Sequence, residues 1–132
     1  KEAVKVPVIG NGDVTTVEDA TTLLEQSGAD GGMEGRGCYG RPWFINQIGH
    51  YLKTGTLLPD PDMTIQRQTV KNHLDDILSH YGIATGIKIA RKHVAWYSKG
   101  LNNSADYRVA VNRVEDPQTM HQLIDDFYKP LI

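Results

Sequence analysis

Two glycine-rich stretches near the start of the chain have residue types suited to binding an anion. The first is Gly10–Asp13, and the second is Gly31–Gly37, which includes Glu34 and Arg36. Glycine lets the backbone approach a ligand closely, and successive N–H groups beside a helix N-terminus can hold a phosphate. A single loop of this kind is better explained by a tight turn. Two of them, each after an expected strand, favour a phosphate site.

The segments around these loops predict a strand–helix–strand unit. Val4–Ile9 and Ala29–Met33 have the composition of short buried strands. Between them, Thr16 with Asp19 three residues later resembles a capping box, and Gly28 is placed to end that helix. Parallel strands present their ligands at their carboxyl ends, and (β/α)8 barrels use the loops after strands 7 and 8 for phosphate. The sequence therefore predicts that the two glycine loops lie side by side.

The chain after Pro42 is predicted to be helical. The proline suits the first turn of a helix, and the expected apolar face of that helix is Trp43, Phe44, Ile45, Ile48, Tyr51 and Leu52. A linker with two prolines, Thr54–Asp62, follows. We then expect four helices forming a bundle: one capped by Thr64 and stopped by Gly82, one over 84–99, one over 105–114, and one after the Asp116–Pro117 cap.

The helix expected over residues 84–99 has two contrasting faces at a spacing of 100° per residue. The apolar face is Ile87, Ala90, Val94 and Tyr97. The opposite face is Lys88, Arg91, Lys92, Ala95 and Lys99. A continuous basic stripe of this kind can follow a nucleic-acid backbone. Trp96 on its flank could stack on an exposed base, although core packing is the favoured interpretation of this residue.

Charge is unevenly distributed along the 132 residues, whose net charge is −2. Residues 64–113 hold eight basic and three acidic side chains, a net charge of +5, and the remainder carries −7. A basic segment in a mildly acidic chain is consistent with a polyanion-binding face. On charge count alone, a solvated and salt-bridged helix surface is the better interpretation.

Several kinds of chemistry find no support in the sequence. The His, Cys, Asp and Glu residues show no metal-binding spacing, and we expect His73, His80 and His93 to be surface or partly buried residues that do not face one another. A helix N-terminus near Cys38 could lower its pKa, but an unreactive small residue is the favoured interpretation. No apolar run is long enough to span a membrane. The single cysteine favours a reducing, cytoplasmic setting.

At this point the motifs resemble a known family, the tRNA-dihydrouridine synthases, and within it the bacterial B-type subgroup. The resemblance rests on Val6–Val14, on Ala29–Gly37 with Gly40–Trp43, on Ile89–Gly100, and on Asn112–Arg113. It implies an α/β plus all-α fold: the last two βα units of an FMN-binding (β/α)8 TIM barrel over residues 1–41, a connecting helix and linker over 42–63, and a helical tRNA-binding domain over 64–132. Because the chain begins at Lys1, we expect it to be a C-terminal fragment of a longer protein.

The resemblance implies an FMN-dependent oxidoreductase that reduces uridine in tRNA to 5,6-dihydrouridine, with NADPH re-reducing the flavin. By position in the motifs, the FMN-binding residues are Asn11, Gly12, Asp13, Gly35 and Arg36. The implied tRNA-binding residues are Lys88, Arg91, Lys92, His93, Lys99 and Arg113. The family's catalytic cysteine lies upstream and is not Cys38, so this chain is expected to have no catalytic residue and no activity by itself. Glu34 stands where the family has an apolar residue, and its carboxylate would repel a phosphate.

Two alternatives remain open at this stage. The first is a non-catalytic RNA-binding helical module, which the basic segment alone would satisfy. The second is another FMN barrel oxidoreductase that acts on a small molecule, for which a basic helical extension has no evident use.

Overall fold

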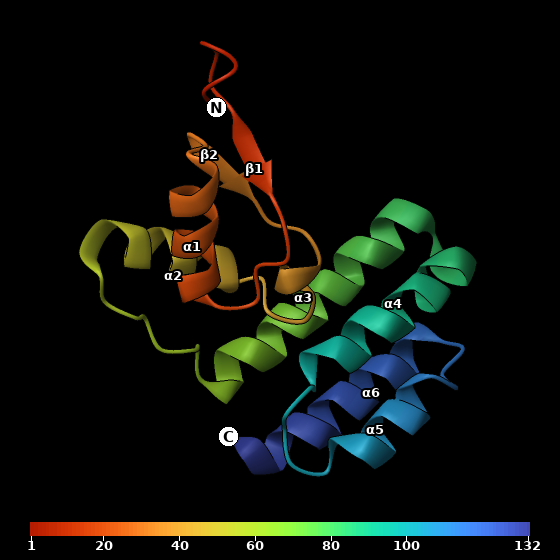
Figure 1. Cartoon of the computed structure of the whole chain (residues 1–132). Coiled ribbons are helices and arrows are strands. Elements are labelled where there is room, and N and C mark those ends of the chain that lie inside the picture. Colours follow the sequence, from red (N-terminus) through yellow and green to blue (C-terminus); the bar gives the residue numbers. More distant parts are fainter. The chain divides into compact units, whose positions relative to one another are not determined.

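The structure, a computed structural model, describes all residues from Lys1 to Ile132, and the chain divides into two units, residues 1–60 and 61–132 (Figure 1). The N-terminal unit contains β1 (Ile9–Asn11), α1 (Val17–Ser27), β2 (Gly31–Met33), a 3₁₀ turn (Arg36–Cys38) and α2 (Phe44–Thr54). The C-terminal unit contains α3 (Met63–Tyr81), α4 (Ile83–Tyr97), α5 (Ser104–Val111), α6 (Pro117–Tyr128) and a final 3₁₀ turn (Lys129–Leu131). None of these helices is long and apolar enough to cross a membrane.

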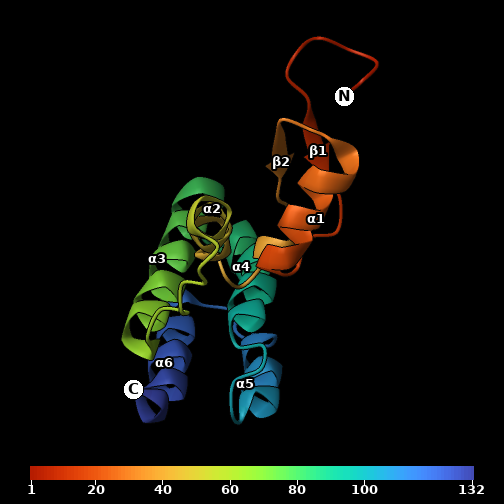
Figure 2. The same ribbon diagram turned by 60° about the vertical axis from the view of Figure 1, so that its left-hand side comes forward.

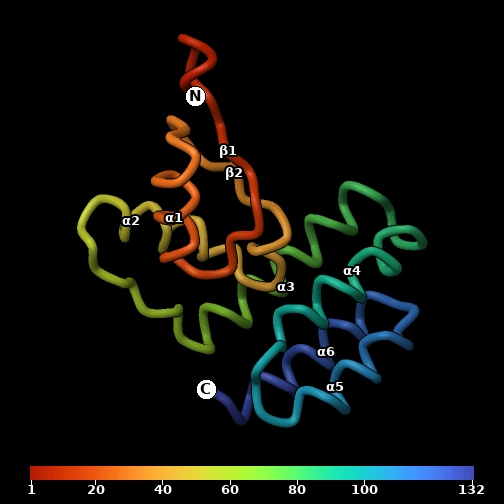
Figure 3. Tube along the Cα trace, viewed as in Figure 1, coloured from red at the N-terminus to blue at the C-terminus, as the bar shows by residue number.

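The two strands of the N-terminal unit run parallel, as the sequence predicts, with Gly10 opposite Gly32 in the register. The tube trace shows the chain leaving β1, returning through α1 and re-entering the sheet as β2 (Figure 3). Leu23 of α1 lies over the paired glycines, because a Cβ at either would come within 3.7 Å of a Leu23 methyl group. α1 therefore packs on one face of the pair.

The prediction of two buried strands is wrong in length and in burial. Regular pairing starts at Ile9 rather than Val4, because Pro7 has no N–H to donate and the Val8 N–H is bonded to the Asp30 carboxylate at 2.8 Å. The second strand likewise starts at Gly31 rather than at Ala29. Since α1 covers a single face, several large apolar side chains in and before the strands are exposed: Val4, Val6, Ile9 and Met33.

The helix between the strands begins and ends where the sequence predicts. Thr16 Oγ1 accepts a hydrogen bond from the Asp19 N–H, and Asp19 Oδ2 accepts one from the Thr16 N–H, both at 3.1 Å, which completes the capping box. Gly28 ends the helix with φ of 66°, a left-handed conformation that favours glycine. These local signals are confirmed.

Helix α2 packs against α1 to form the small core of the N-terminal unit. The buried residues of this core are Val14, Val17, Ala20, Phe44 and Ile48. The helix begins at Phe44 rather than at Pro42, because Pro42 and Trp43 belong to the preceding turn. Of the apolar face predicted for it, Ile45 and Leu52 are exposed.

The four helices of the C-terminal unit pack side by side, α3 against α4 and α6, and α5 against α4 and α6, and we call this unit the bundle (Figures 1 and 2). The residues predicted to face its interior on α4 are all buried: Ile87, Ala90, Val94 and Tyr97. The predicted stop at Gly82 and the Asp116–Pro117 cap are confirmed. The prediction of Thr64 as a cap is wrong, because Asp62 Oδ1 accepts the Ile65 N–H at 2.9 Å instead.

Close packing between α3 and α4 depends on a glycine. A Cβ on Gly86 would lie 3.1 Å from the Leu78 Cα and 3.3 Å from the Ile77 carbonyl oxygen, so a side chain here would push α3 and α4 apart by a few tenths of an ångström. Between α3 and α6, Lys71 pairs with Asp125 at 2.9 Å, and the His121 ring lies 2.7 Å from Asp75. The bundle is thus held by apolar packing inside and by polar pairs between α3 and α6.

Candidate functional site

The two glycine loops meet in one pocket at the carboxyl ends of β1 and β2. The pocket has a volume of about 550 Å³. It is lined by Asn11, Gly12, Asp13, Val14, Thr15, Glu34, Gly35, Arg36 and Gly37. All five residues that the sequence analysis assigns to FMN therefore lie around a single pocket. Three of the nine lining residues are glycines, which can present only backbone to a ligand.

The contact between the loops explains one of these glycines. A Cβ on Gly37 would overlap the carbonyl oxygen of Val14, which is backbone and cannot turn aside. Gly35, in contrast, has open space where a side chain would project. The second loop can therefore come this close to the first only because residue 37 has no side chain.

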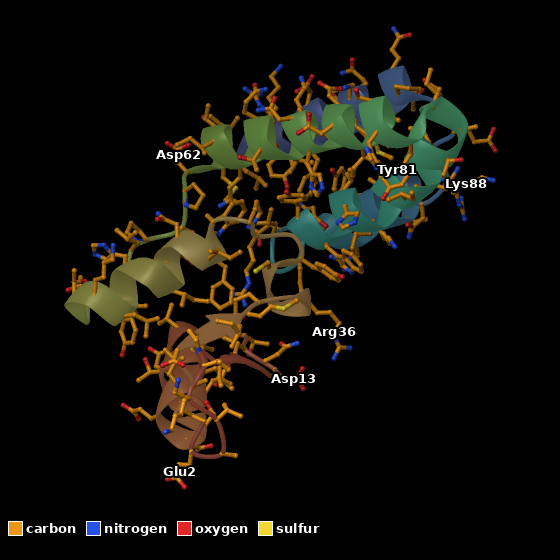
Figure 4. All side chains as sticks on the ribbon, turned by 90° about the horizontal axis from the view of Figure 1, so that it is seen from above. Glu2, Asp13, Arg36, Asp62, Tyr81 and Lys88 are labelled. Atoms are coloured by element: carbon orange, nitrogen blue, oxygen red, sulfur yellow. The ribbon has the colours of Figure 1, made fainter.

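Charged side chains of opposite sign stand at the pocket. Arg36 Nη2 lies 3.4 Å from Asp13 Oδ1, with the two side chains 82% and 91% exposed (Figure 4). An ion pair this long and this exposed is weak, so an anionic ligand could take the guanidinium from it. Glu34 also lines the pocket, and burial raises the pKa of its carboxyl group.

Arg41 ties the two loops together from outside the pocket lining. Its guanidinium donates hydrogen bonds to the carbonyl oxygens of Gly37 and Thr15. Arg41 lies in the Gly40–Trp43 part of the family motif, but no role was predicted for it. The signal in the sequence is its position just after the second loop.

Cys38 does not have the environment that would activate it. It is the last residue of the Arg36–Cys38 turn, so it lies at the end of that turn and not at an N-terminus. Burial, with the nearby Glu34 carboxylate, raises the pKa of the thiol. The idea of a lowered pKa is wrong, and the unreactive interpretation fits the structure.

The basic face of α4 is only partly as predicted. Lys88, Lys92 and Lys99 are exposed, and Lys88 projects outward from α4 in Figure 4. Arg91 is half-buried and donates from Nε to the Val114 carbonyl oxygen at 2.8 Å. Ala95 is 8% exposed, so it belongs to the buried side. The basic stripe is therefore a set of three lysines and not a continuous row.

The histidines of the bundle also differ from expectation. The rings of His73 and His93 face each other with centroids 5.0 Å apart, and His73 Nδ1 lies 3.0 Å from the Tyr97 hydroxyl. Burial lowers the pKa of His73, and burial followed by the charges of His73 and Lys92 lowers that of His93. The prediction that these residues do not face one another is wrong. A lowered pKa favours the uncharged form of the His93 ring.

Arg113 and Trp96, two further residues considered for RNA binding, are both exposed. Arg113 is exposed in the turn between α5 and α6. Trp96 is 36% exposed, with the His93 ring edge-on to it at 5.1 Å. The expectation that Trp96 is buried in the core is therefore wrong.

Comparison with known proteins gives a consistent result over the whole chain. Residues 1–131 match the family model described as dihydrouridine synthase. A probable tRNA-dihydrouridine synthase of Rickettsia bellii is 52% identical over 132 residues, which is 100% of this chain and 40% of the relative. The tRNA-dihydrouridine synthase B of Xanthomonas campestris is 42% identical over the same coverage, and that of Pseudomonas aeruginosa is 37% identical over 97% of this chain and 39% of the relative. The chain thus spans about 40% of the length of these curated relatives.

Proposed function

Since this chain belongs to the dihydrouridine synthase family, we propose that it forms part of a flavin-dependent enzyme that reduces uridine to 5,6-dihydrouridine in tRNA. In this proposal β1 and β2 are the last two strands of a (β/α)8 barrel, and α3–α6 form the tRNA-binding domain. The chain contributes part of the FMN site and the RNA-binding surface. The catalytic acid comes from elsewhere in the complete protein.

The observation that carries the proposal is the single pocket formed by the two glycine loops. Its position beyond the carboxyl ends of parallel strands is where α/β proteins bind phosphate-bearing ligands. The backbone of Gly12, Asp13 and Gly35 can come close to a phosphate dianion, and Arg36 can give it a charge-assisted hydrogen bond. The Glu34 carboxylate, which also lines the pocket, opposes the dianion, and Arg36 has to offset it. Asn11 would bind the ribityl chain beside it. When bound, FMN supplies the reducing equivalents, which NADPH replenishes.

The exposed basic residues of the C-terminal unit would bind the tRNA backbone. Lys88, Lys92, Lys99 and Arg113 are the direct contacts in this proposal, because all four are exposed. Arg91 and His93 would contribute at the edge of that surface, since each is half-buried. Arg91 would also keep the start of α6 in place through the Val114 carbonyl oxygen.

Removal of the gene tests the enzymatic proposal. A strain without it should lose dihydrouridine at defined positions of its tRNAs, as read by mass spectrometry, and the wild-type gene should restore them. A gene carrying Arg36→Ala should restore less, because the phosphate would lose its charged partner. Unchanged dihydrouridine in the deletion strain, with no second family member present, would contradict the proposal.

The alternative is a non-catalytic RNA-binding module. Its only support is the exposure of Lys88, Lys92 and Lys99 on α4. Replacing Lys88, Lys92 and Lys99 by alanine should weaken tRNA binding. It should also reduce the slope of log K against log salt concentration by about two to three. The matched control is alanine at the exposed Lys5, Lys53 and Lys129, which removes the same charge elsewhere. Equal effects of the two triple variants would show that the α4 lysines are ordinary surface charges. RNA binding without any change of dihydrouridine in the deletion strain would favour the module.

A further inference from the structure

Arg41 makes three contacts that converge on the crossing of the two pocket loops. Its Nε donates to the Gly37 carbonyl oxygen at 2.8 Å, and its Nη2 donates to the Thr15 carbonyl oxygen. Its Cζ lies 3.8 Å from the centre of the Phe44 ring, and Phe44 is 1% exposed. One guanidinium therefore joins the loop after β1 to the loop after β2 and rests on the core of the N-terminal unit.

The first loop is fixed at the same residue from its other side. Asp19 Oδ2 accepts hydrogen bonds from the Thr15 N–H at 3.0 Å and from the Thr15 hydroxyl at 3.1 Å. Thr15 is thus bonded through its amide and hydroxyl to α1 and through its carbonyl to Arg41. We call this chain of contacts, Asp19–Thr15–Arg41–Gly37, the bridge. It fixes Gly37 relative to α1, and Gly37 lies directly against Val14.

An arginine is needed at this position for geometric reasons. Its planar guanidinium offers two donors in fixed directions while its flat face stacks on an aromatic ring. A lysine ammonium carries the same charge but cannot hold two carbonyl oxygens and a ring in that arrangement. Arg41 is absent from the pocket lining, so its effect on a ligand would pass through the loops.

We propose that Arg41 is a positioning residue that sets the spacing of the two loops, and that phosphate affinity in the pocket depends on it although it does not touch the phosphate. The proposal rests on the proposed function, since it takes the pocket to be the FMN phosphate site. It separates the roles of two arginines five residues apart in the sequence, with Arg36 binding the ligand and Arg41 holding the loops.

The test compares FMN with riboflavin, which lacks the phosphate, as ligands of the complete protein. Arg41→Lys should weaken FMN binding about tenfold, as expected for the loss of a charge-assisted hydrogen bond. It should leave riboflavin binding and the salt dependence of FMN binding unchanged, because the charge is kept. Arg36→Ala should weaken FMN binding and also reduce its salt dependence. The matched control is Arg67→Lys, which lies outside the N-terminal unit and should change neither ligand.

A second readout needs no flavin. In the ligand-free chain, Arg41→Lys should speed amide hydrogen exchange of residues 12–15 and 35–37 while α1 and α2 keep their protection. If the wild type does not prefer FMN over riboflavin, the proposed function fails, and the exchange experiment alone decides on the bridge. Wild-type exchange in both loops of Arg41→Lys, or an undiminished FMN preference in that variant, would overturn the inference.

Discussion

The two units of this chain are stabilised in different ways. The C-terminal unit has side chains with no exposed surface at all on each of its four helices: Val70, Leu74, Ala90, Val111, Met120 and Ile124. The N-terminal unit has a smaller core, and large apolar side chains near its strands remain exposed. Its loops are instead fixed by hydrogen bonds of the Thr16–Asp19 box and of Arg41. Packing dominates in one unit, and directed polar contacts dominate in the other.

This difference corresponds to what each unit presents. A pocket formed between two loops needs those loops at a defined separation, which hydrogen bonds and one close glycine contact can set. A surface of lysines needs only a stable helix beneath it, which packing supplies. The comparison predicts that the two units respond differently to the same kinds of change.

Truncation inside the bundle should have the largest effect. Leu74→Ala removes a side chain with 0% exposure and should destabilise the C-terminal unit by about 2–5 kcal/mol, from lost burial and the cavity left behind. Chemical unfolding followed by region-resolved hydrogen exchange would measure it. The control, Leu57→Ala, removes a 58% exposed side chain and should cost little. If Leu74→Ala reduced amide protection equally in both units, the two units would not differ in how they are stabilised.

Glycine-to-alanine changes on two helices should have opposite signs. Gly86→Ala places a methyl group against the backbone of Leu78 and Ile77 and should destabilise the bundle by about 1–3 kcal/mol. Gly49→Ala lies on α2 with open space around it and should stabilise that helix by about 0.5–1 kcal/mol. Thermal unfolding of the two variants gives both values. A stabilising Gly86→Ala would mean that α3 and α4 can move apart at little cost.

Mild acid should give a smaller effect, a loss of stability in the bundle and not in the N-terminal unit. Because burial lowers the pKa values of His73 and His93, their contribution to stability is present above about pH 6.5 and is lost as the pH falls through the lowered values. In the N-terminal unit, hydrogen bonds lower the pKa values of Asp19 and Asp30, so their contribution is lost only below about pH 3.8.

Stability curves between pH 5 and 8 would measure this difference, with histidine NMR titration as the direct check. His73→Gln keeps a polar group beside Tyr97 but cannot be protonated, so it should flatten the slope for the C-terminal unit. An equal slope in the two units, or an unchanged slope in His73→Gln, would contradict the assignment.

The sequence predicted the features that depend on neighbouring residues. The Thr16–Asp19 box, the helix stops at Gly28 and Gly82, and the Asp116–Pro117 cap are set within a few residues of chain. The heptad-like spacing on α4 also identified its buried residues correctly. These signals were sufficient to predict the strand–helix–strand order, the parallel pairing and the presence of four helices in the C-terminal unit.

The errors arise where distant segments decide the outcome. Arg91 turns to the Val114 carbonyl oxygen, 23 positions away, and His73 meets His93 across two helices, which helical periodicity on one segment cannot reveal. The burial of the strands was overestimated for the same reason, since burial depends on what covers each face. Arg41 was missed as a bridge because Thr15 is 26 positions away.

The single-residue connection at Gly82 has a consequence for the order of folding. With φ of 80°, it joins α3 and α4 without any further loop, so closing this helical hairpin costs little chain entropy. Contacts of α3 with α6 must bring together residues about 50 positions apart, such as Lys71 and Asp125, and local contacts generally form sooner. We expect the α3–α4 hairpin to act as the folding nucleus of the bundle, with α6 docking late. Kinetic φ-values near one at the α3–α4 crossing and near zero on α6 are the expected signature, and the reverse pattern would exclude it.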